Sequence, residues 1–170
     1  MKKQALTLAL ASVLIPASAY ASDITTEEVE AAQAAWGNGI VEIGKAADPK
    51  QAAIAHIDKF YGFDMGSVLF KPTLASEDQF RGTKQEALSY FIGQDLKEDK
   101  GFALAPYTKV RWENEGIIVD EDSAVAMGNY FFTKTDGEEV KVEFTLGYVK
   151  DKNGNLKINL HHSSLPYSAN

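Results

Sequence analysis

The sequence predicts an α+β domain in which helices come first and an antiparallel meander of strands follows. Up to about residue 92, apolar side chains recur at steps of three and four, the period of a helix with one buried face. From Ala103 onward, apolar and polar residues alternate, the period of a strand. The pairs Asp136-Gly137 and Asn153-Gly154 are strong hairpin signals. This order is typical of helices packed on one face of a sheet.

The first residues have the features of a secretory signal peptide. Lys2 and Lys3 form a basic start, an apolar run covers 5–15, and Ala19 and Ala21 are the small residues that cleavage requires. An uncleaved membrane anchor is the alternative, but the apolar run is short for a membrane span. We therefore expect a signal peptide over 1–21, a single domain over 22–170, and a periplasmic or secreted location.

The expected mature chain is acidic and has no cysteine. It carries 15 lysines and arginines against 24 aspartates and glutamates, a formal charge of −9. This charge disfavours nucleic acid, whose binding depends on neutralising phosphates, and it disfavours anionic membranes. Without disulfides, the core alone must hold the domain together. With no cysteine and only three histidines, the sequence indicates no metal site, and it indicates no cofactor.

Three helices are predicted from their start signals. A capping box, in which threonine and a glutamate three residues later satisfy each other's backbone N–H groups, precedes the first and third helices. An Asp-Pro pair starts the second, because aspartate is a good N-cap and proline fits the first turn. These signals are Thr25 with Glu28, Asp48-Pro49, and Thr83 with Glu86.

The strands are predicted from alternation and turns. A strand over 67–71 ends before Pro72, because proline cannot donate to a ladder. Residues 78–81 are a candidate for another short strand. The meander then consists of five runs, namely 103–114, 117–120, 123–134, 138–150 and 155–164.

The last strand carries two of the three histidines. Regular alternation places Leu160 and His162 on one face, and His161 and Ser163 on the other. His162 then ends an apolar row, either as a pocket residue or as a buried histidine bonded to backbone. His161 is expected at a subunit interface or on the surface. There it would oppose Glu143 of the preceding strand, as an acid/base pair or as a plain cross-strand charge pair.

Cations and tyrosines supply the other candidates for ligand binding. Lys71 and Arg81 lie at strand ends, and Arg111 alternates with apolar neighbours. Each suits a ligand clamp, although a structural ion pair is the more common role. Tyrosines can donate a hydroxyl into an apolar pocket, or can serve simply as core residues. The tyrosine candidates are Tyr90, Tyr130 and Tyr148.

The order of elements also resembles a known fold. The helices, VLFKPT (68–73), QFRG (79–82) and the long meander are similar to the nuclear transport factor 2-like cone, the superfamily of ketosteroid isomerase and the SnoaL-like cyclases. The C-terminal half resembles the association domain of calcium/calmodulin-dependent protein kinase II. The matching stretches are EDSAVAMGNYFFTKTDG (121–137), VEFTLGYVKDKNG (142–154) and LKINLHHSSLPY (156–167).

This resemblance implies a cone-shaped, strongly curved antiparallel sheet with three N-terminal helices packed on its concave face. It also implies a pocket between sheet and helices, and a sheet surface that self-associates into a homodimer or higher homo-oligomer. The kinase association domain lines its pocket with arginines. The matching positions here hold Tyr130 and Leu146, so that anion clamp is not retained.

The leading hypothesis is an exported, self-associating, non-enzymatic domain whose pocket binds a small organic ligand. No catalytic motif stands out, since a nucleophile elbow, a phosphate loop and HExxH are all absent from the sequence. The alternative is a pocket enzyme, an isomerase, cyclase or hydrolase of a small apolar substrate. A second alternative is a purely structural oligomerisation module. Fold does not choose among these, because one fold hosts many functions.

Overall fold

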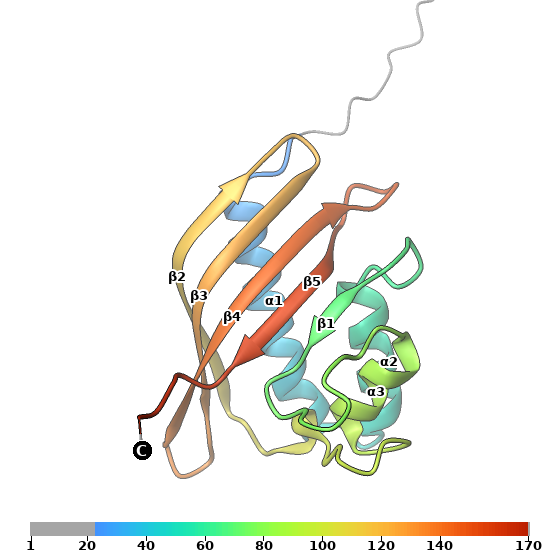
Figure 1. Ribbon diagram of the computed structural model, residues 1–170, viewed down its shortest axis with the longest axis vertical. Helices are drawn as coiled ribbons and strands as arrows, with labels where there is room; N and C mark the ends of the chain where they lie inside the picture. Colours follow the sequence, from blue (N-terminus) through green and yellow to red (C-terminus); the bar gives the residue numbers. More distant parts are fainter. Residues whose placement is uncertain (1–22, 170) are drawn as a thin grey trace, which may run out of the picture.

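The computed structural model describes residues 23–169, which form a layer of helices against a sheet (Figure 1). The signal peptide expected at 1–21 lies outside the described residues. Within 23–169, the helices are too short or too polar to cross a lipid bilayer.

The three predicted helices are confirmed as α1 (Thr26–Lys45), α2 (Pro49–Phe60) and α3 (Lys84–Ile92). Both predicted capping boxes are formed, at the starts of α1 and α3. The Asp48 side chain accepts the N–H of Gln51 at the start of α2. Local signals within four residues of each helix start therefore fix these boundaries.

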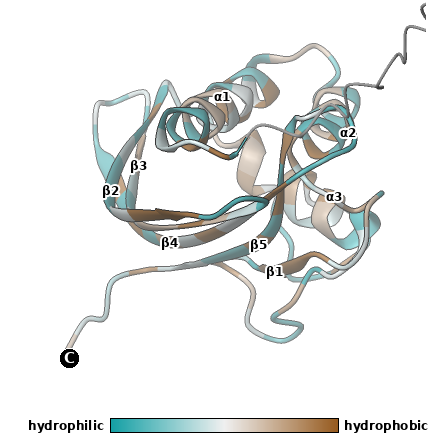
Figure 2. Ribbon diagram, turned by 90° about the horizontal axis from the view of Figure 1, so that it is seen from above, coloured by the Kyte–Doolittle hydropathy of each residue, from teal (hydrophilic) through white to brown (hydrophobic). Residues whose placement is uncertain are grey.

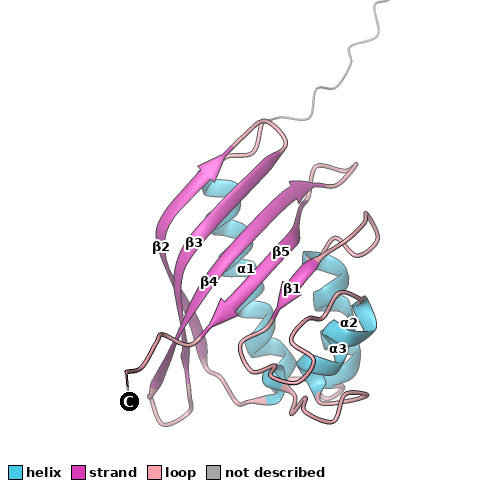
Figure 3. Ribbon diagram, viewed as in Figure 1, coloured by secondary structure: helices cyan, strands magenta, loops and turns pink. Residues whose placement is uncertain are grey.

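The sheet has five strands in the order β1-β5-β4-β3-β2 (Figure 3). β1 runs parallel to β5, and all other neighbours are antiparallel. The expected wholly antiparallel sheet is therefore wrong. After α2, Tyr61 bridges Ile158 of β5 in the parallel sense, and β1 continues in that direction. The strands are β1 (Leu69–Lys71), β2 (Lys109–Val119), β3 (Ser123–Thr133), β4 (Glu139–Lys150) and β5 (Leu156–Ser164), with a 3-10 turn η1 (Phe102–Leu104) before β2.

Two further expectations about the strands are corrected. The runs 103–114 and 117–120 contribute to one strand, β2, because a bulge between Asn114 and Gly116 absorbs the break in alternation. Residues 78–81 are loop, although the Arg81 N–H donates to the Phe70 carbonyl at 2.8 Å. The strongly curved sheet expected from the resemblance is also wrong, because the sheet is not strongly curled.

The helices gather on one side of the sheet (Figure 2). Along β3 and β4, buried and more exposed side chains alternate residue by residue for most of their length. On the inner face, Tyr130 and Phe132 contact Trp36 of α1, with ring centroids 6.0 and 6.5 Å apart. The other face, which carries Val125 and Met127, is called the outer face below.

A bulge in β5 changes the alternation of the last strand. Ile158 pairs with Tyr148, and Leu160 pairs with Gly147, so Asn159 is an extra residue without a counterpart on β4. A shift by one residue turns every later side chain to the opposite face.

The faces expected for the two adjacent histidines are wrong for this reason. His161 and Ser163 are buried on the inner face, whereas His162 is exposed on the outer face. Glu143 also faces outward and accepts a hydrogen bond from Ser164 at 3.0 Å. The expected Glu143–His161 pair does not form, because the two side chains lie on opposite faces of the sheet.

Candidate active site

A small cavity lies between the inner face of the sheet and the helices. Its volume is about 60 Å³. Most of its wall is aromatic or aliphatic, including Trp36, Phe91 and Phe132. A mostly apolar pocket with a few convergent polar groups is the usual form of a small-molecule site. Besides Tyr90 and Tyr107, the polar residues in its wall are Thr73, Tyr130, His161 and Ser163.

These four residues form one cluster of neutral polar groups. The Thr73 hydroxyl donates to the Ser163 hydroxyl at 2.9 Å. The Tyr130 hydroxyl lies 3.4 Å from Nε2 of His161 and also contacts the hydroxyls of Ser163 and Thr73. In apolar surroundings, hydrogen bonds from such groups to a negatively charged ligand are stronger than in water.

Three segments of the chain bring the cluster together. His161 and Ser163 are alternate residues of β5, placed inward by its bulge. Tyr130 points to the same face from β3, which is separated from β5 by β4. Thr73 follows β1, whose parallel pairing with β5 sets Phe70 beside His161.

The imidazole of His161 is fixed on both sides. The Phe70 ring stacks on it, with centroids 5.0 Å apart and an interplanar angle of 21°. Its Nδ1 lies 2.8 Å from the hydroxyl of Tyr61, the residue that follows α2. Burial lowers the pKa of His161 to about 3, and the neighbouring His162 adds to the effect. His161 is therefore uncharged at neutral pH.

Tyr130 is a protonated phenol in this site. Burial raises its pKa, and hydrogen bonds with Ser163 and Thr73 oppose that rise. Trp112 of β2 stacks on its ring, with centroids 4.9 Å apart and an interplanar angle of 29°. The ring is thus held in place while the hydroxyl remains able to donate to a ligand.

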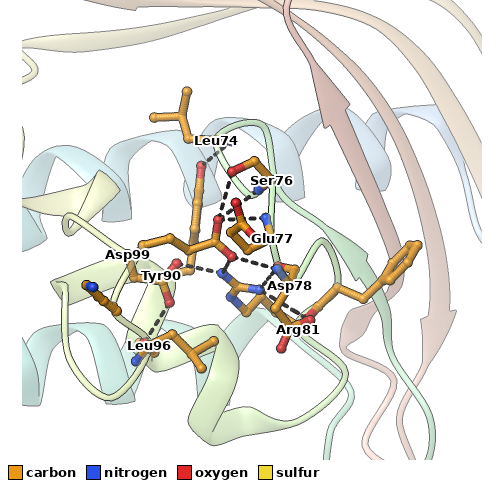
Figure 4. Close-up of polar contacts among 12 residues, drawn as sticks. Leu74, Ser76, Glu77, Asp78, Arg81, Tyr90, Leu96 and Asp99 are labelled. Atoms are coloured by element: carbon orange, nitrogen blue, oxygen red, sulfur yellow. Dashed lines mark hydrogen bonds and ion pairs between the residues drawn. The ribbon is translucent and has the colours of Figure 1, made fainter.

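The loop over 72–80 closes one side of the cavity and is fastened by Arg81 (Figure 4). Leu74 of this loop lines the cavity, and its N–H donates to the Tyr90 hydroxyl at 3.4 Å. Arg81 has no exposed surface; its Nη2 donates to Asp99 at 2.7 Å and to Glu98 at 3.3 Å.

Glu98 also fastens this loop. Its carboxylate accepts the backbone N–H groups of Ser76, Glu77 and Asp78 at 2.8, 3.1 and 2.9 Å. These hydrogen bonds lower the pKa of Glu98 to about 2, and the bond from Ser76 has the largest effect. The carboxylate thus links Arg81 to the backbone of the loop that carries Thr73.

The predicted ligand residues are only partly brought together. Tyr90 and Tyr130 line the cavity. Tyr148 is buried in the core but is not part of the cavity wall. Arg81 is engaged by carboxylates beside the cavity rather than directed into it.

Two other predicted cations and His162 lie on the outer face. Lys71 pairs with His162 across β1 and β5. Arg111 forms ion pairs with Glu113 and with Glu139, the latter at 3.1 Å. Its guanidinium also lies over the Phe131 ring, 3.9 Å from the ring centroid. The sheet separates all of these groups from the cavity.

Thr73 and Ser163 are cavity residues that the sequence did not predict. The two-residue spacing of His161 and Ser163 correctly places both side chains on the same face of the strand. Alternation alone predicted the outer face, whereas the bulge in β5 turns both side chains to the inner face. Thr73 follows a strand of three residues, which is too short to carry a periodic signal.

Across residues 23–169, no three histidine, cysteine, aspartate or glutamate side chains gather as ligands for a metal ion.

The fold has counterparts among known structures. A putative calcium/calmodulin-dependent protein kinase II association domain from Xanthomonas campestris matches with a TM-score of 0.59 at 24% identity, covering 96% of this chain and 100% of that one. Other proteins of the nuclear transport factor 2-like superfamily share the fold. The predicted nuclear transport factor 2-like fold is confirmed. The predicted special likeness to the kinase association domain is superseded by relatives of higher identity.

Those relatives are carbonic anhydrases. A metal-independent carbonic anhydrase from Nostoc sp. (strain PCC 7120 / SAG 25.82 / UTEX 2576) is 46% identical over 153 residues, which cover 85% of this chain and 75% of the relative. The crystal structure of a cyanobacterial iota-carbonic anhydrase complexed with bicarbonate matches at 40% identity and a TM-score of 0.84, covering 94% of this chain and 100% of that one. The family model of metal-independent carbonic anhydrases matches residues 27–165. The chain therefore belongs to the metal-independent carbonic anhydrase family.

Proposed function

We propose that the protein interconverts carbon dioxide and bicarbonate in the cavity around His161. One observation carries the proposal beyond family membership: three hydroxyls and an uncharged imidazole converge in a small apolar cavity. The cyanobacterial relative was crystallised with bicarbonate, which supports the same ligand here. In the net reaction, carbon dioxide and water give bicarbonate and one proton, so no further reactant is needed.

The size of the cavity suits this substrate. A water molecule requires about 10–15 Å³ of such volume, so 60 Å³ holds roughly four small groups. Carbon dioxide with an attacking water fits this space, and so does bicarbonate. A multi-ring organic molecule does not fit without movement of the walls.

The lining matches the charge that develops during hydration. Apolar walls favour carbon dioxide, which has no net charge. When water attacks the carbon, it loses a proton to the surrounding water, and the former carbon dioxide oxygens become negative. The hydroxyls of Tyr130, Ser163 and Thr73 are placed to donate to these oxygens. The described wall contains no lysine or arginine, so bicarbonate is held by neutral donors, which favours its release.

The leading hypothesis from the sequence, a non-enzymatic ligand-binding module, is corrected by these findings. The chain belongs to a family named for an enzymatic activity. The alternative, a pocket enzyme acting on a small apolar molecule, agrees better with the family. The reaction is a hydration, however, and not the isomerisation, cyclisation or hydrolysis that the alternative named.

Tyr130→Phe tests the proposed site by removing one hydroxyl while keeping the ring that stacks on Trp112. We expect kcat/KM for carbon dioxide hydration to fall about a hundredfold, because loss of one donor to a developing oxyanion has that order of effect. Stopped-flow measurement with a pH indicator and a chelator present gives the rate.

His162→Ala is the matched control, since this side chain is exposed on the outer face. It should keep the rate of the unaltered protein. A folded, unaltered protein that hydrates carbon dioxide no faster than buffer would contradict the proposed function.

We further propose that the protein is exported and self-associates. The outer face exposes Ile118, Val125 and Met127, with exposed fractions of 75, 44 and 54%, and Lys141 and Glu143 of β4 place both charges nearby. Apolar groups flanked by both charges suit contact with a second copy of the same surface.

Mass spectrometry tests both statements on protein expressed in bacteria with its own N-terminus and recovered from the periplasm or medium. The denatured mass should correspond to a chain that begins at Ser22, and the native mass should be a multiple of it. A chain that keeps residues 1–21 would contradict cleavage, and a monomer at all concentrations would contradict self-association.

A further inference from the structure

Tyr61 contacts His161, a member of the cluster of neutral polar groups, from outside the cavity. Its hydroxyl lies 2.8 Å from Nδ1 of His161, while the opposite ring nitrogen, Nε2, lies 3.4 Å from the Tyr130 hydroxyl. Tyr61 is buried, with 1% of its surface exposed, and is not part of the cavity wall. Its hydroxyl also accepts a hydrogen bond from Nε1 of Trp36 at 3.2 Å.

Counting the hydrogens gives this chain of contacts a direction. The indole of Trp36 can only donate, so the Tyr61 oxygen is the acceptor in that contact. The single hydrogen of Tyr61 is then free to donate, and Nδ1 of His161 is the acceptor within reach. A neutral imidazole that accepts at Nδ1 carries its hydrogen at Nε2. That nitrogen is the one that faces Tyr130.

We propose that Tyr61, oriented by Trp36, is a positioning residue that holds His161 in the tautomer with its hydrogen on Nε2. The proposal rests on the proposed function, because it assigns Tyr61 a part in carbon dioxide hydration. In this arrangement His161 donates to the oxygen of Tyr130. The hydrogen of Tyr130 is then directed away from His161, toward the substrate oxygens and the neighbouring hydroxyls.

The consequence is a set of donors aligned in one direction, from Trp36 through Tyr61, His161 and Tyr130 into the cavity. Each bond in such a chain polarises the next, so the Tyr130 hydroxyl becomes a stronger donor to an oxygen that gains negative charge. In the other tautomer, Nε2 would accept the hydrogen of Tyr130 and withdraw it from the substrate.

The fold fixes Tyr61 in this role. Its N–H donates to the Ile57 carbonyl at 2.9 Å and ends α2, and its backbone bridges Ile158, three residues before His161. Its ring lies nearly parallel to the imidazole, with an interplanar angle of 21°. Because the end of α2 is tied to β5, the backbone of Tyr61 is held close to the strand that carries His161.

The first test is the tautomer itself, read by nitrogen NMR on protein labelled with ¹⁵N-histidine. The chain has three histidines, and His161→Gln assigns the His161 signals by their loss. We expect a protonated Nε2 and a bare Nδ1 on His161 in the unaltered protein. A protonated Nδ1 would overturn the proposal. This measurement requires no activity and no change at Tyr61, so it is independent of the proposed function.

The second test is Tyr61→Phe, with Tyr148→Phe as the matched control on another buried tyrosine. Tyr61→Phe should shift His161 toward the Nδ1–H tautomer and lower kcat about tenfold, with a smaller change in KM. Tyr148→Phe should change neither quantity. An unchanged tautomer or an unchanged kcat in folded Tyr61→Phe would overturn the positioning role. Absence of hydration by the unaltered protein would instead refute the proposed function.

Discussion

Arg81 and Arg111 are the two arginines of the chain, and burial separates their roles. The Arg81 side chain has no exposed surface, and that of its partner Asp99 is only 1% exposed. Arg111 lies on the outer face, 33% exposed, beside Glu113 and Glu139. Water screens an exposed ion pair, whereas a buried charge that loses its partner has no such compensation.

Arg81→Met should therefore lower the free energy of unfolding by about 3–5 kcal/mol, because Asp99 remains buried without its cation. The loop over 72–80 should loosen as well, and the rate of hydration should fall with it. Urea unfolding followed by tryptophan fluorescence measures the free energy, since Trp36 and Trp112 pack together around the site.

Arg111→Met is the matched control for this change. It removes a cation of the same shape from a solvated surface and should cost about 1 kcal/mol or less. Similar losses for both variants would show that Arg81 does not anchor the loop.

Among the elements, those defined by local signals agree with the sequence prediction. The capping boxes and the hairpin turns depend on residues within a few positions of one another, so the sequence displays them directly. Tyr130, a candidate pocket residue from the sequence, does line the cavity, and it lies on β3, whose pairing with β4 has no bulge.

The face of β5 depended on a contact between strands and was not predictable from alternation. The side chain of the extra residue, Asn159, lies against Gly147 of β4, where a second side chain would not fit. A Cβ at Gly147 would approach the Asn159 side-chain oxygen to 2.8 Å and the Leu160 Cβ to 2.9 Å. The glycine and the bulge are thus one feature, formed by residues that are distant in sequence.

The contacts of Thr73 and Tyr61 show the same limit. Thr73 bonds Ser163 across 90 positions of sequence, and Tyr61 bonds His161 across 100. A tyrosine at the end of a helix and a threonine after a proline are common, so neither residue stands out in the sequence as part of a site. Two parallel contacts with β5 bring these hydroxyls to the histidine, namely the pairing of β1 and the bridge from Tyr61 to Ile158, and no local pattern indicates either.

For the whole molecule, two buried histidines connect stability to pH. Burial lowers the pKa of His56 to about 3 and that of His161 to about 3. Across residues 23–169, neither ring nitrogen of His56 has a hydrogen-bond partner, so protonation would place an unpaired charge in the core. In the unfolded chain, both side chains titrate near pH 6.5.

The folded state should therefore lose stability as the pH falls below about 6.5. Above that value both histidines are neutral in both states, and their contribution is complete. Between about 6.5 and the folded pKa values near 3, the unfolded chain binds protons that the folded chain excludes. Each histidine then lowers the free energy of unfolding by about 1.4 kcal/mol per pH unit. The lowered pKa of Glu98 adds a loss only below about 4.5.

Urea unfolding at intervals from pH 7.5 to 4.5 measures this dependence, and His56→Leu separates it from the titration of the acidic surface. The leucine variant fills the same buried site without a titrating group, so its loss of stability between pH 6 and 4.5 should be shallower by about 1.4 kcal/mol per pH unit. His162→Ala, changed at an exposed histidine, should keep the slope of the unaltered protein. Parallel curves for the leucine variant and the unaltered protein would mean that His56 takes up its proton without unfolding the core, and that the acid sensitivity belongs to His161 alone.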